Sequence, residues 1–136
     1  MRVDVAALQR FSEAALAETL RLISERAEKL NSVDEINVVL VSDRRIAELH
    51  KRFMNIAGPT DVITFQHGDI IVSVDTAARS AEEHATSTIA EIQLYLVHGI
   101  LHLLGLDDHD PAGAAAMADE QQKICAAARK RLNQLG

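Results

Sequence analysis

Apolar residues in the first part of the chain recur at the spacing of one helical face. Residues 5–30 alternate short apolar groups with charged residues, and this pattern predicts a single amphipathic helix over the whole range. We expect the buried face of this helix to carry Leu8, Phe11, Ala15, Leu16, Leu20 and Ile23.

The pattern then changes from helical spacing to a β-branched run. The segment EINVVLVSD, residues 35–43, predicts a buried strand that ends at Ser42. Asp43 is expected to cap the helix that follows, because an aspartate side chain accepts hydrogen bonds from the first backbone N–H groups of a helix. That helix would be RRIAELHKRFM, and its inward positions would be Ile46, Leu49 and Phe53.

Two short apolar segments further along the chain predict a hairpin. Glycine and proline mark NIAGPTD, residues 55–61, as a loop. The segments VITF at 62–65 and DIIVSV at 69–74 are predicted as strands that the turn QHG joins. Asp75 is expected to cap a helix over residues 76–85.

The longest apolar segment, Ile89 to Leu104, follows a cluster of serine and threonine. Because it is apolar on nearly every side, it predicts a central, buried helix. Gly105 would stop this helix, and Asp110 with Pro111 would start the last one. The chain shows no repeats and no interdomain linker, and it predicts one α/β domain whose small sheet is covered by helices.

Composition and charge narrow the class of protein. The 136 residues are 48% hydrophobic and 25% charged, as in soluble globular domains. A net charge of −6 argues against a general nucleic-acid coat, although a local basic patch can still bind phosphate. The single cysteine, Cys125, excludes an internal disulfide framework and is expected to be buried in a helix. Since neither a signal peptide nor a membrane-spanning stretch is recognisable, we expect a cytoplasmic protein that does not enter membranes.

Two histidines on the central helix suggest a metal site. His98 and His102 are four residues apart, so both rings lie on one face, at the spacing with which helical histidine pairs bind zinc. After Gly105 the chain can turn back and offer a third ligand, either Asp108 or His109. Three protein ligands with an open fourth position are typical of catalytic zinc. In the alternative interpretation the histidines belong to an ordinary core helix, but two imidazoles are costly to bury without partners.

Two further positions on this helix bear on the chemistry. Glu91, seven residues before His98, either orients that histidine or is a helix-start carboxylate that the helix dipole stabilises. Gly99 stands where zinc peptidases of the H-E-x-x-H kind carry their glutamate base. A peptidase would therefore lack its base, and another group would have to activate the water.

The segment HGILHLLGLDDH resembles the signature H-G-x-L-H-L-x-G-Y/F-D-H of the YbeY family of endoribonucleases, the rRNA maturation factors of bacteria. The matching residues are His98, Gly99, Leu101, His102, Leu103, Gly105 and Asp107. The segments GPTDVITF, GDIIVSVDTA and EIQLYLVHG also resemble family motifs, in the same order. The resemblance extends from about Val38 into the last helix.

The resemblance implies a single α+β domain over residues 1–136, in which helices cover a small mixed sheet and the central histidine helix is zincin-like. It also implies one Zn²⁺ per chain and metal-dependent cleavage of single-stranded RNA. In the family this activity serves maturation of the 16S rRNA 3′ end and ribosome quality control. The partners that it implies are rRNA and, beyond it, a ribosomal protein or a GTPase.

The identity of the third ligand stays open between two neighbours. The family pattern places its third histidine ten residues after the first, and that position is Asp108 here, with His109 one residue late. Register favours Asp108, whereas the softness and neutral charge of imidazole favour His109. We expect His98, His102 and Asp108 to be the catalytic metal ligands, with His109 as the alternative.

Substrate contacts are less clearly marked. Many family members carry an arginine about five residues before the proline of P-T-D, and this position is Met54 here. Lys51 and Arg52 are close to this position, and Arg44 and Arg45 lie one or two turns earlier. We expect one of them, Arg52 in the first place, to contact RNA phosphate instead, although charges on such a helix are more often a solvated face. Ser73 and Asp75 are expected to line the cleft. The remaining polar candidates are expected to be turn or surface residues, namely Thr60, Asp61, His67 and His84.

Two other functions remain as alternatives. The absence of the usual arginine at Met54 is compatible with a non-catalytic ribosome-binding module that uses the metal for stability. The second alternative is a zinc hydrolase that acts on a peptide or a small molecule. Gly99 argues against a peptidase, because the glutamate base is missing at this position.

Overall fold

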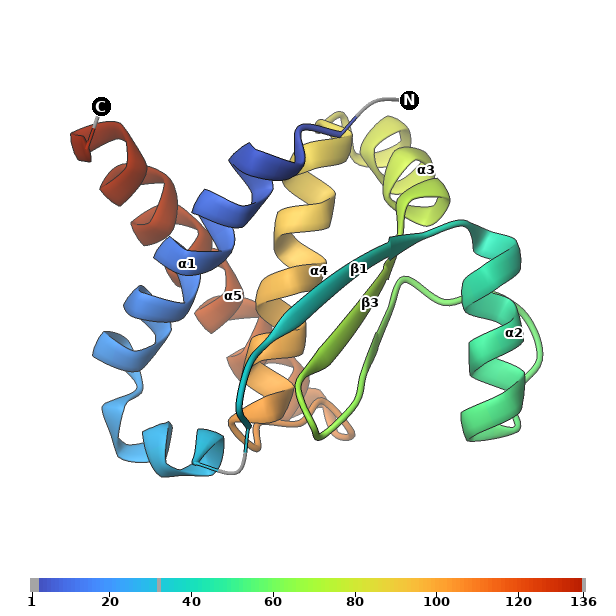
Figure 1. Cartoon of the computed structure of the whole chain (residues 1–136), viewed down its shortest axis with the longest axis horizontal. Coiled ribbons are helices and arrows are strands. Elements are labelled where there is room, and N and C mark those ends of the chain that lie inside the picture. The colour runs from blue at the N-terminus through green and yellow to red at the C-terminus, as the bar shows by residue number, and fades with distance from the viewer. Residues whose placement is uncertain (1–2, 32, 136) are drawn as a thin grey trace.

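The computed structural model describes residues 3–31 and 33–135, and it shows helices on both faces of one small sheet (Figure 1). The elements in chain order are α1 (Val5–Leu22), η1 (Ser24–Leu30), β1 (Asn37–Val41), α2 (Asp43–Met54), β2 (Val62–Thr64), β3 (Asp69–Ser73), α3 (Val74–His84), α4 (Thr88–Leu103) and α5 (Pro111–Leu135). The predicted α+β class with a small mixed sheet is confirmed.

The sheet has the strand order β1-β3-β2. β1 runs parallel to β3, with Val39 opposite Ile71, and β2 runs antiparallel to β3, with Ile63 opposite the same residue. The hairpin predicted around QHG is therefore confirmed as β2 and β3. Successive side chains of a strand point to opposite faces, so the sheet contributes to two clusters. Ile70 and Val72 belong to the main core, whereas Ile63 and Ile71 pack with Ile46 of α2.

Helix α4 lies at the centre of the main core, as its all-round apolar sequence predicts (Figure 1). It contacts α1, α3, α5 and both strands of the hairpin. Gly99 permits the close approach to the sheet, because a Cβ atom at this position would lie 2.7 Å from Cγ2 of Ile70. Ile70 is fully buried, so it has little room to move aside. Cys125 of α5 is fully buried as expected, and burial raises the pKa of its thiol to about 11.

The prediction of one helix over residues 5–30 is wrong in its last third. Helix α1 ends at Leu22, and Ile23 leaves helical geometry with φ −126° and ψ 49°. Ile23 is buried in the main core, and the chain continues as the 3-10 segment η1, in which no residue is buried. The break thus inserts Ile23 into the core while the next turns stay at the surface.

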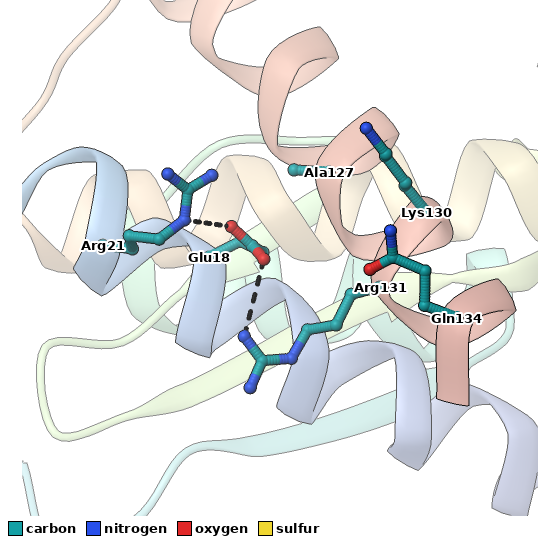
Figure 2. Close-up of a pocket in the computed structure, with 6 residues that line it drawn as sticks. All are labelled: Glu18, Arg21, Ala127, Lys130, Arg131 and Gln134. Atoms are coloured by element: carbon teal, nitrogen blue, oxygen red, sulfur yellow. Dashed lines mark hydrogen bonds and ion pairs between the residues drawn. The ribbon is translucent and has the colours of Figure 1, made fainter. Parts of the chain in front are cut away.

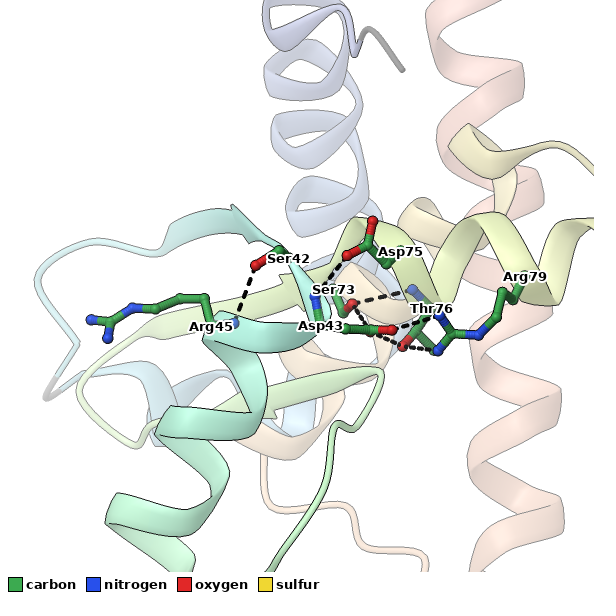
Figure 3. A network of polar contacts seen from close by, with 7 residues as sticks. All are labelled: Ser42, Asp43, Arg45, Ser73, Asp75, Thr76 and Arg79. Carbon is green, nitrogen blue, oxygen red and sulfur yellow. Dashed lines mark hydrogen bonds and ion pairs between the residues drawn. The ribbon is translucent and has the colours of Figure 1, made fainter.

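The predicted caps of α2 and α3 are each off by one or two residues. The Ser42 hydroxyl, not the Asp43 carboxylate, accepts from the backbone N–H of Arg45 and caps α2. Ser73 rather than Asp75 caps α3 through the N–H of Thr76, while the Asp75 carboxylate accepts from the backbone N–H of Asp43 at 2.9 Å (Figure 3). The cap of α5 is as predicted, since Asp110 Oδ1 accepts from Gly113 N–H at 2.6 Å.

Helices α1 and α5 are joined near their ends by one carboxylate. Glu18 of α1 lies between Arg21, whose Nε is 2.7 Å away, and Arg131 of α5, whose Nη1 is 3.5 Å away (Figure 2). The Glu18 side chain is only 10% exposed. Its hydrogen bond to Arg21 holds the pKa of the carboxyl below the ordinary value, against the opposing effect of burial. This pairing links α5 to α1.

Within the described ranges, the helices lack the combination of length and apolarity that crossing a lipid bilayer requires.

Candidate metal centre

Three side chains that can ligate a metal converge where α4 ends. His98 and His102 project from the last turns of α4, and Asp108 lies in the loop before α5. The two Nε2 atoms are 2.9 Å apart, and the Asp108 carboxylate oxygens lie 3.6 Å from His98 Nε2 and 4.0 Å from His102 Nε2. One ligand atom of each residue lies within 4.8 Å of the others. The predicted metal ligands are therefore neighbours in space.

The local sequence explains how Asp108 reaches the histidines. Gly105 adopts φ +88°, which glycine reaches without the strain that other residues would carry. Its N–H bonds to the carbonyl of His102, and the N–H of Leu106 bonds back to Leu101 at 3.1 Å. These bonds close the helix and reverse the chain. Asp110 then fixes the far end of the loop as the cap of α5, so Asp108 is held between two anchored points.

His109 does not belong to this cluster. The residue is exposed, and its backbone N–H donates to Asp107 Oδ1 at 3.1 Å in a local turn. Of the two candidates for the third ligand, the structure brings Asp108 to the histidine pair. This placement agrees with the family register and supports the prediction that Asp108 is the ligand.

A residue that the sequence analysis did not identify orients His98. Gln121 of α5 places its side-chain Oε1 2.5 Å from His98 Nδ1. Because an amide oxygen can only accept, Nδ1 carries the proton, and the lone pair of Nε2 faces the cluster, where His102 Nε2 lies 2.9 Å away. Such outer partners fix the tautomer and the ring orientation of metal-binding histidines.

Glu91 does not supply this orientation, contrary to one of its two predicted roles. It is buried in the first turn of α4, and its Oε1 accepts from the Thr86 hydroxyl at 2.6 Å. The alternative, a carboxylate at the start of the helix, agrees with the structure.

The donor set fits zinc. Burial, followed by the nearby His98, lowers the pKa of His102, although Asp108 acts in the opposite direction. A lowered pKa favours the neutral imidazole, which is the form that binds a metal. Two imidazole nitrogens and one carboxylate oxygen are ordinary zinc ligands, and three of them leave a coordination position for water or substrate. We conclude that His98, His102 and Asp108 can hold a metal ion.

The residues that were expected to contact the substrate are not part of the cluster of His98, His102 and Asp108. Arg52 is exposed on α2, with its guanidinium carbon 5.3 Å from the centre of the Phe53 ring. Ser73 is fully buried, and its hydroxyl donates to Asp43 Oδ1 at 2.6 Å while accepting from Thr76 (Figure 3). With both interactions made inside the protein, Ser73 is a structural cap, and the expectation that it binds substrate is not supported. Asp61 behaves as a turn residue, since its carboxylate accepts from the N–H of Val62.

The Asp43 carboxylate joins the starts of α2 and α3. It accepts from Ser73, from the hydroxyl of Thr76 at 2.7 Å and from the guanidinium of Arg79 (Figure 3). The hydrogen bond from Arg79, followed by those from Ser73 and Thr76, lowers the pKa of Asp43 to about 2 against the opposing effect of burial. The network explains why Asp43 and Ser73 are polar at positions that do not face the metal cluster.

Comparison with known proteins agrees with this arrangement. The family described as Endoribonuclease YbeY matches residues 2–129. A protein from Thermobifida fusca named Endoribonuclease YbeY is 34% identical over 139 residues, covering 90% of this chain and 89% of the relative. One of the same name from Anaeromyxobacter dehalogenans is 40% identical over 103 residues, covering 68% of this chain and 53% of that protein. The chain thus spans about half the length of the Anaeromyxobacter relatives that it matches.

A solved structure shares the fold. The solution structure of TM1509 from Thermotoga maritima superposes with a TM-score of 0.58 at 27% identity, covering 87% of this chain and 86% of that one. The family match extends over nearly the whole chain and includes the helix that carries both histidines, the loop that carries Asp108 and most of α5. On these grounds the chain belongs to the YbeY family.

Proposed function

We propose that this protein is a zinc-dependent endoribonuclease that cleaves single-stranded RNA and matures the 3′ end of 16S rRNA in the cytoplasm. The observation that carries the proposal is the convergence of His98, His102 and Asp108, with Gln121 orienting the first of them. The relatives that share this chain's family are named as endoribonucleases. A ribosomal protein or a GTPase as a further partner belongs to the same proposal.

The chain's own residues have separate tasks in this proposal. His98, His102 and Asp108 would hold one Zn²⁺, which supplies Lewis-acid polarisation of a phosphate and activation of water when bound. Gln121 keeps the proton of His98 on Nδ1, so that Nε2 stays available to the metal. The Gly99 contact with Ile70 leaves no room for a glutamate base at that position, which disfavours the peptidase alternative.

The test is cleavage of a single-stranded RNA that ends in an unprocessed 16S 3′ extension, with metal content measured on the same samples. Wild type should hold about one zinc per chain and cleave the RNA, whereas His102→Ala should lose both properties. His84→Ala is the matched control, because His84 is an exposed histidine at the end of α3. It should keep full zinc loading and full cleavage.

The possible results separate the functions. Zinc binding without cleavage by wild type would overturn the nuclease proposal and favour a metal-stabilised ribosome-binding module. Cleavage that survives in His102→Ala would mean that the metal cluster is not the catalytic site. Absence of metal from wild type would mean that the two histidines belong to an ordinary core helix and do not bind a metal.

A further inference from the structure

The face of the sheet turned away from α4 is only partly covered by α2. A pocket of about 520 Å³ lies between α2 and this face, within the roughly 300–1,000 Å³ of ordinary ligand pockets. We call it the α2–sheet pocket, and its apolar lining is Val39, Val41, Leu49, Phe53, Phe65 and Ile71. Phe53 is 56% exposed and Val39 is 40% exposed, so a partly open apolar surface remains.

Three rings form a row along this pocket. Phe53 meets Phe65 edge to face, with ring centres 5.2 Å apart, and Phe65 stacks on His67 with ring centres 5.7 Å apart and 16° between the planes. The whole chain has only three phenylalanines, and two of them are here. The outer rings, Phe53 and His67, are the exposed members of the row. Flat exposed rings beside an apolar floor suit a flat, aromatic ligand.

The helix that borders the pocket carries positive charge that suits a polyanion. Helix α2 carries four basic residues and two acidic ones in a chain whose net charge is −6. Lys51 and Arg52 directly precede Phe53 in the sequence, and within residues 3–31 and 33–135 neither forms an ion pair with a carboxylate. The acidic residue at the pocket, Asp69, accepts hydrogen bonds from His67 at 2.8 Å and from the amide of Asn37 at 3.2 Å.

The pocket and the metal cluster lie on opposite faces of one hairpin. Gly99, the neighbour of His98, packs on Ile70, which belongs to the core face of β3. The adjacent residues Asp69 and Ile71 line the pocket on the other face. A strand of nucleic acid that leaves the cluster around the hairpin would therefore meet the row of rings.

We propose that the α2–sheet pocket binds bases of single-stranded RNA, with a base stacked on Phe53 or His67 and with Lys51 and Arg52 contacting phosphates. The proposal rests on the RNA substrate of the proposed function and adds a second contact site outside the metal centre. Aromatic platforms bordered by cations are the general means by which proteins hold single strands without reading sequence. An apolar peptide would use the floor and rings but would have no need of the positive charges of Lys51 and Arg52.

The test is binding, measured without turnover. The probe is a fluorescently labelled 12-nucleotide oligouridylate, titrated with the full chain carrying His102→Ala to prevent cleavage. In that background, Phe53→Ala and His67→Ala should each weaken binding by roughly five-fold or more, the loss typical of one base-stacking contact. Phe53→Trp should keep the affinity, because it keeps a ring. Ile56→Ala is the matched control, since Ile56 is 50% exposed but does not line the pocket.

A second probe separates bases from phosphates. An abasic ribose-phosphate oligomer of the same length should bind the His102→Ala protein more weakly than the oligouridylate does. Adding Phe53→Ala to that protein should not change its affinity for the abasic oligomer. Unchanged affinity of both ring variants for the oligouridylate would overturn the proposal. Equal losses on both oligomers would overturn it as well, because the rings would then not be stacking on bases. A change of oligomeric state in Phe53→Ala, with RNA binding unchanged, would assign the pocket to a protein contact.

The outcome of the binding measurements is independent of the cleavage experiment. If wild type fails to cut RNA but the ring variants still lose affinity, the stacking site stands and the nuclease proposal fails. If cleavage depends on His102 while the ring variants bind normally, the nuclease proposal stands and the stacking site fails.

Discussion

His98 Nδ1 lies 2.5 Å from Oε1 of Gln121, so a residue of α5 fixes the orientation of a ring that belongs to the candidate metal site on α4. Gln121→Ala should therefore weaken zinc binding by roughly 10- to 100-fold, as loss of an orienting partner generally does. Competition with a chromogenic chelator measures the effect. Gln122→Ala, at the exposed neighbouring position, should bind zinc like wild type. Equal affinity of the two variants would contradict the orienting role.

The third ligand can be decided by two neighbouring substitutions. Asp108→Ala should lose most of its bound zinc, because the carboxylate lies within 4.0 Å of both histidine Nε2 atoms. His109→Ala should keep the zinc, because that residue is exposed and lies outside the cluster. Elemental analysis of both proteins after dialysis gives the metal content. The reverse result would move the ligand to His109.

The contact between Gly99 and Ile70 predicts that a methyl group at position 99 would destabilise the fold. Alanine is favoured over glycine in a helix by about 1 kcal/mol, yet Gly99→Ala should lower the free energy of unfolding by about 1–3 kcal/mol. The physical reason is that the added Cβ would lie 2.7 Å from a fully buried isoleucine. Urea denaturation of both proteins measures the difference.

A double-mutant cycle isolates this contact. In an Ile70→Ala background the cost of Gly99→Ala should vanish, since the atoms that the methyl group meets are gone. A cost that persists there would mean that the glycine serves another purpose.

The low pKa of Asp43 makes stability depend on pH. The folded value is about 2, compared with 3.8 for an ordinary aspartate. A carboxyl whose pKa is lowered by folding adds stability that is complete above about pH 4 and is lost as the pH falls toward 2. Allowing for the 24% exposure of the side chain, we expect about 1–2 kcal/mol.

Asp43→Asn measures this contribution. The variant should be less stable than wild type at pH 6, and the difference should shrink as the pH approaches 2. Glu82→Gln, an exposed substitution in α3, should show no such convergence. Parallel stability profiles of wild type and Asp43→Asn over pH 2–6 would show that the Arg79 network does not stabilise the fold.

Hydrophobic periodicity predicted most elements because each of them buries one face or, in α4, nearly the whole surface. It failed at Ile23, where the apolar spacing continues although the backbone leaves the helix. The caps of α2 and α3 were misplaced because serine and aspartate stand close together at both helix starts, and both residue types cap helices. Only the backbone geometry decides which one does.

The cluster of His98, His102 and Asp108 could be predicted because its members are local in sequence, within one helix and the loop after it. Gln121 could not, because its contact with His98 spans 23 residues and depends on how α5 packs against α4. In the sequence alone, a glutamine on a helix does not indicate that it contacts a histidine on another helix. The burial of Ser73 is likewise a tertiary effect, created when Asp43 and Thr76 surround its hydroxyl.

The dependence of His98 on α5 has a consequence for how the protein is made. A ribosome releases the chain in sequence order, so His98, His102 and Asp108 all emerge before Gln121 does. At that moment His98 lacks the partner that fixes its tautomer, and α1 and α4 still lack the helix that packs against both of them. The candidate metal site is therefore complete only once α5 has emerged and packed against α4.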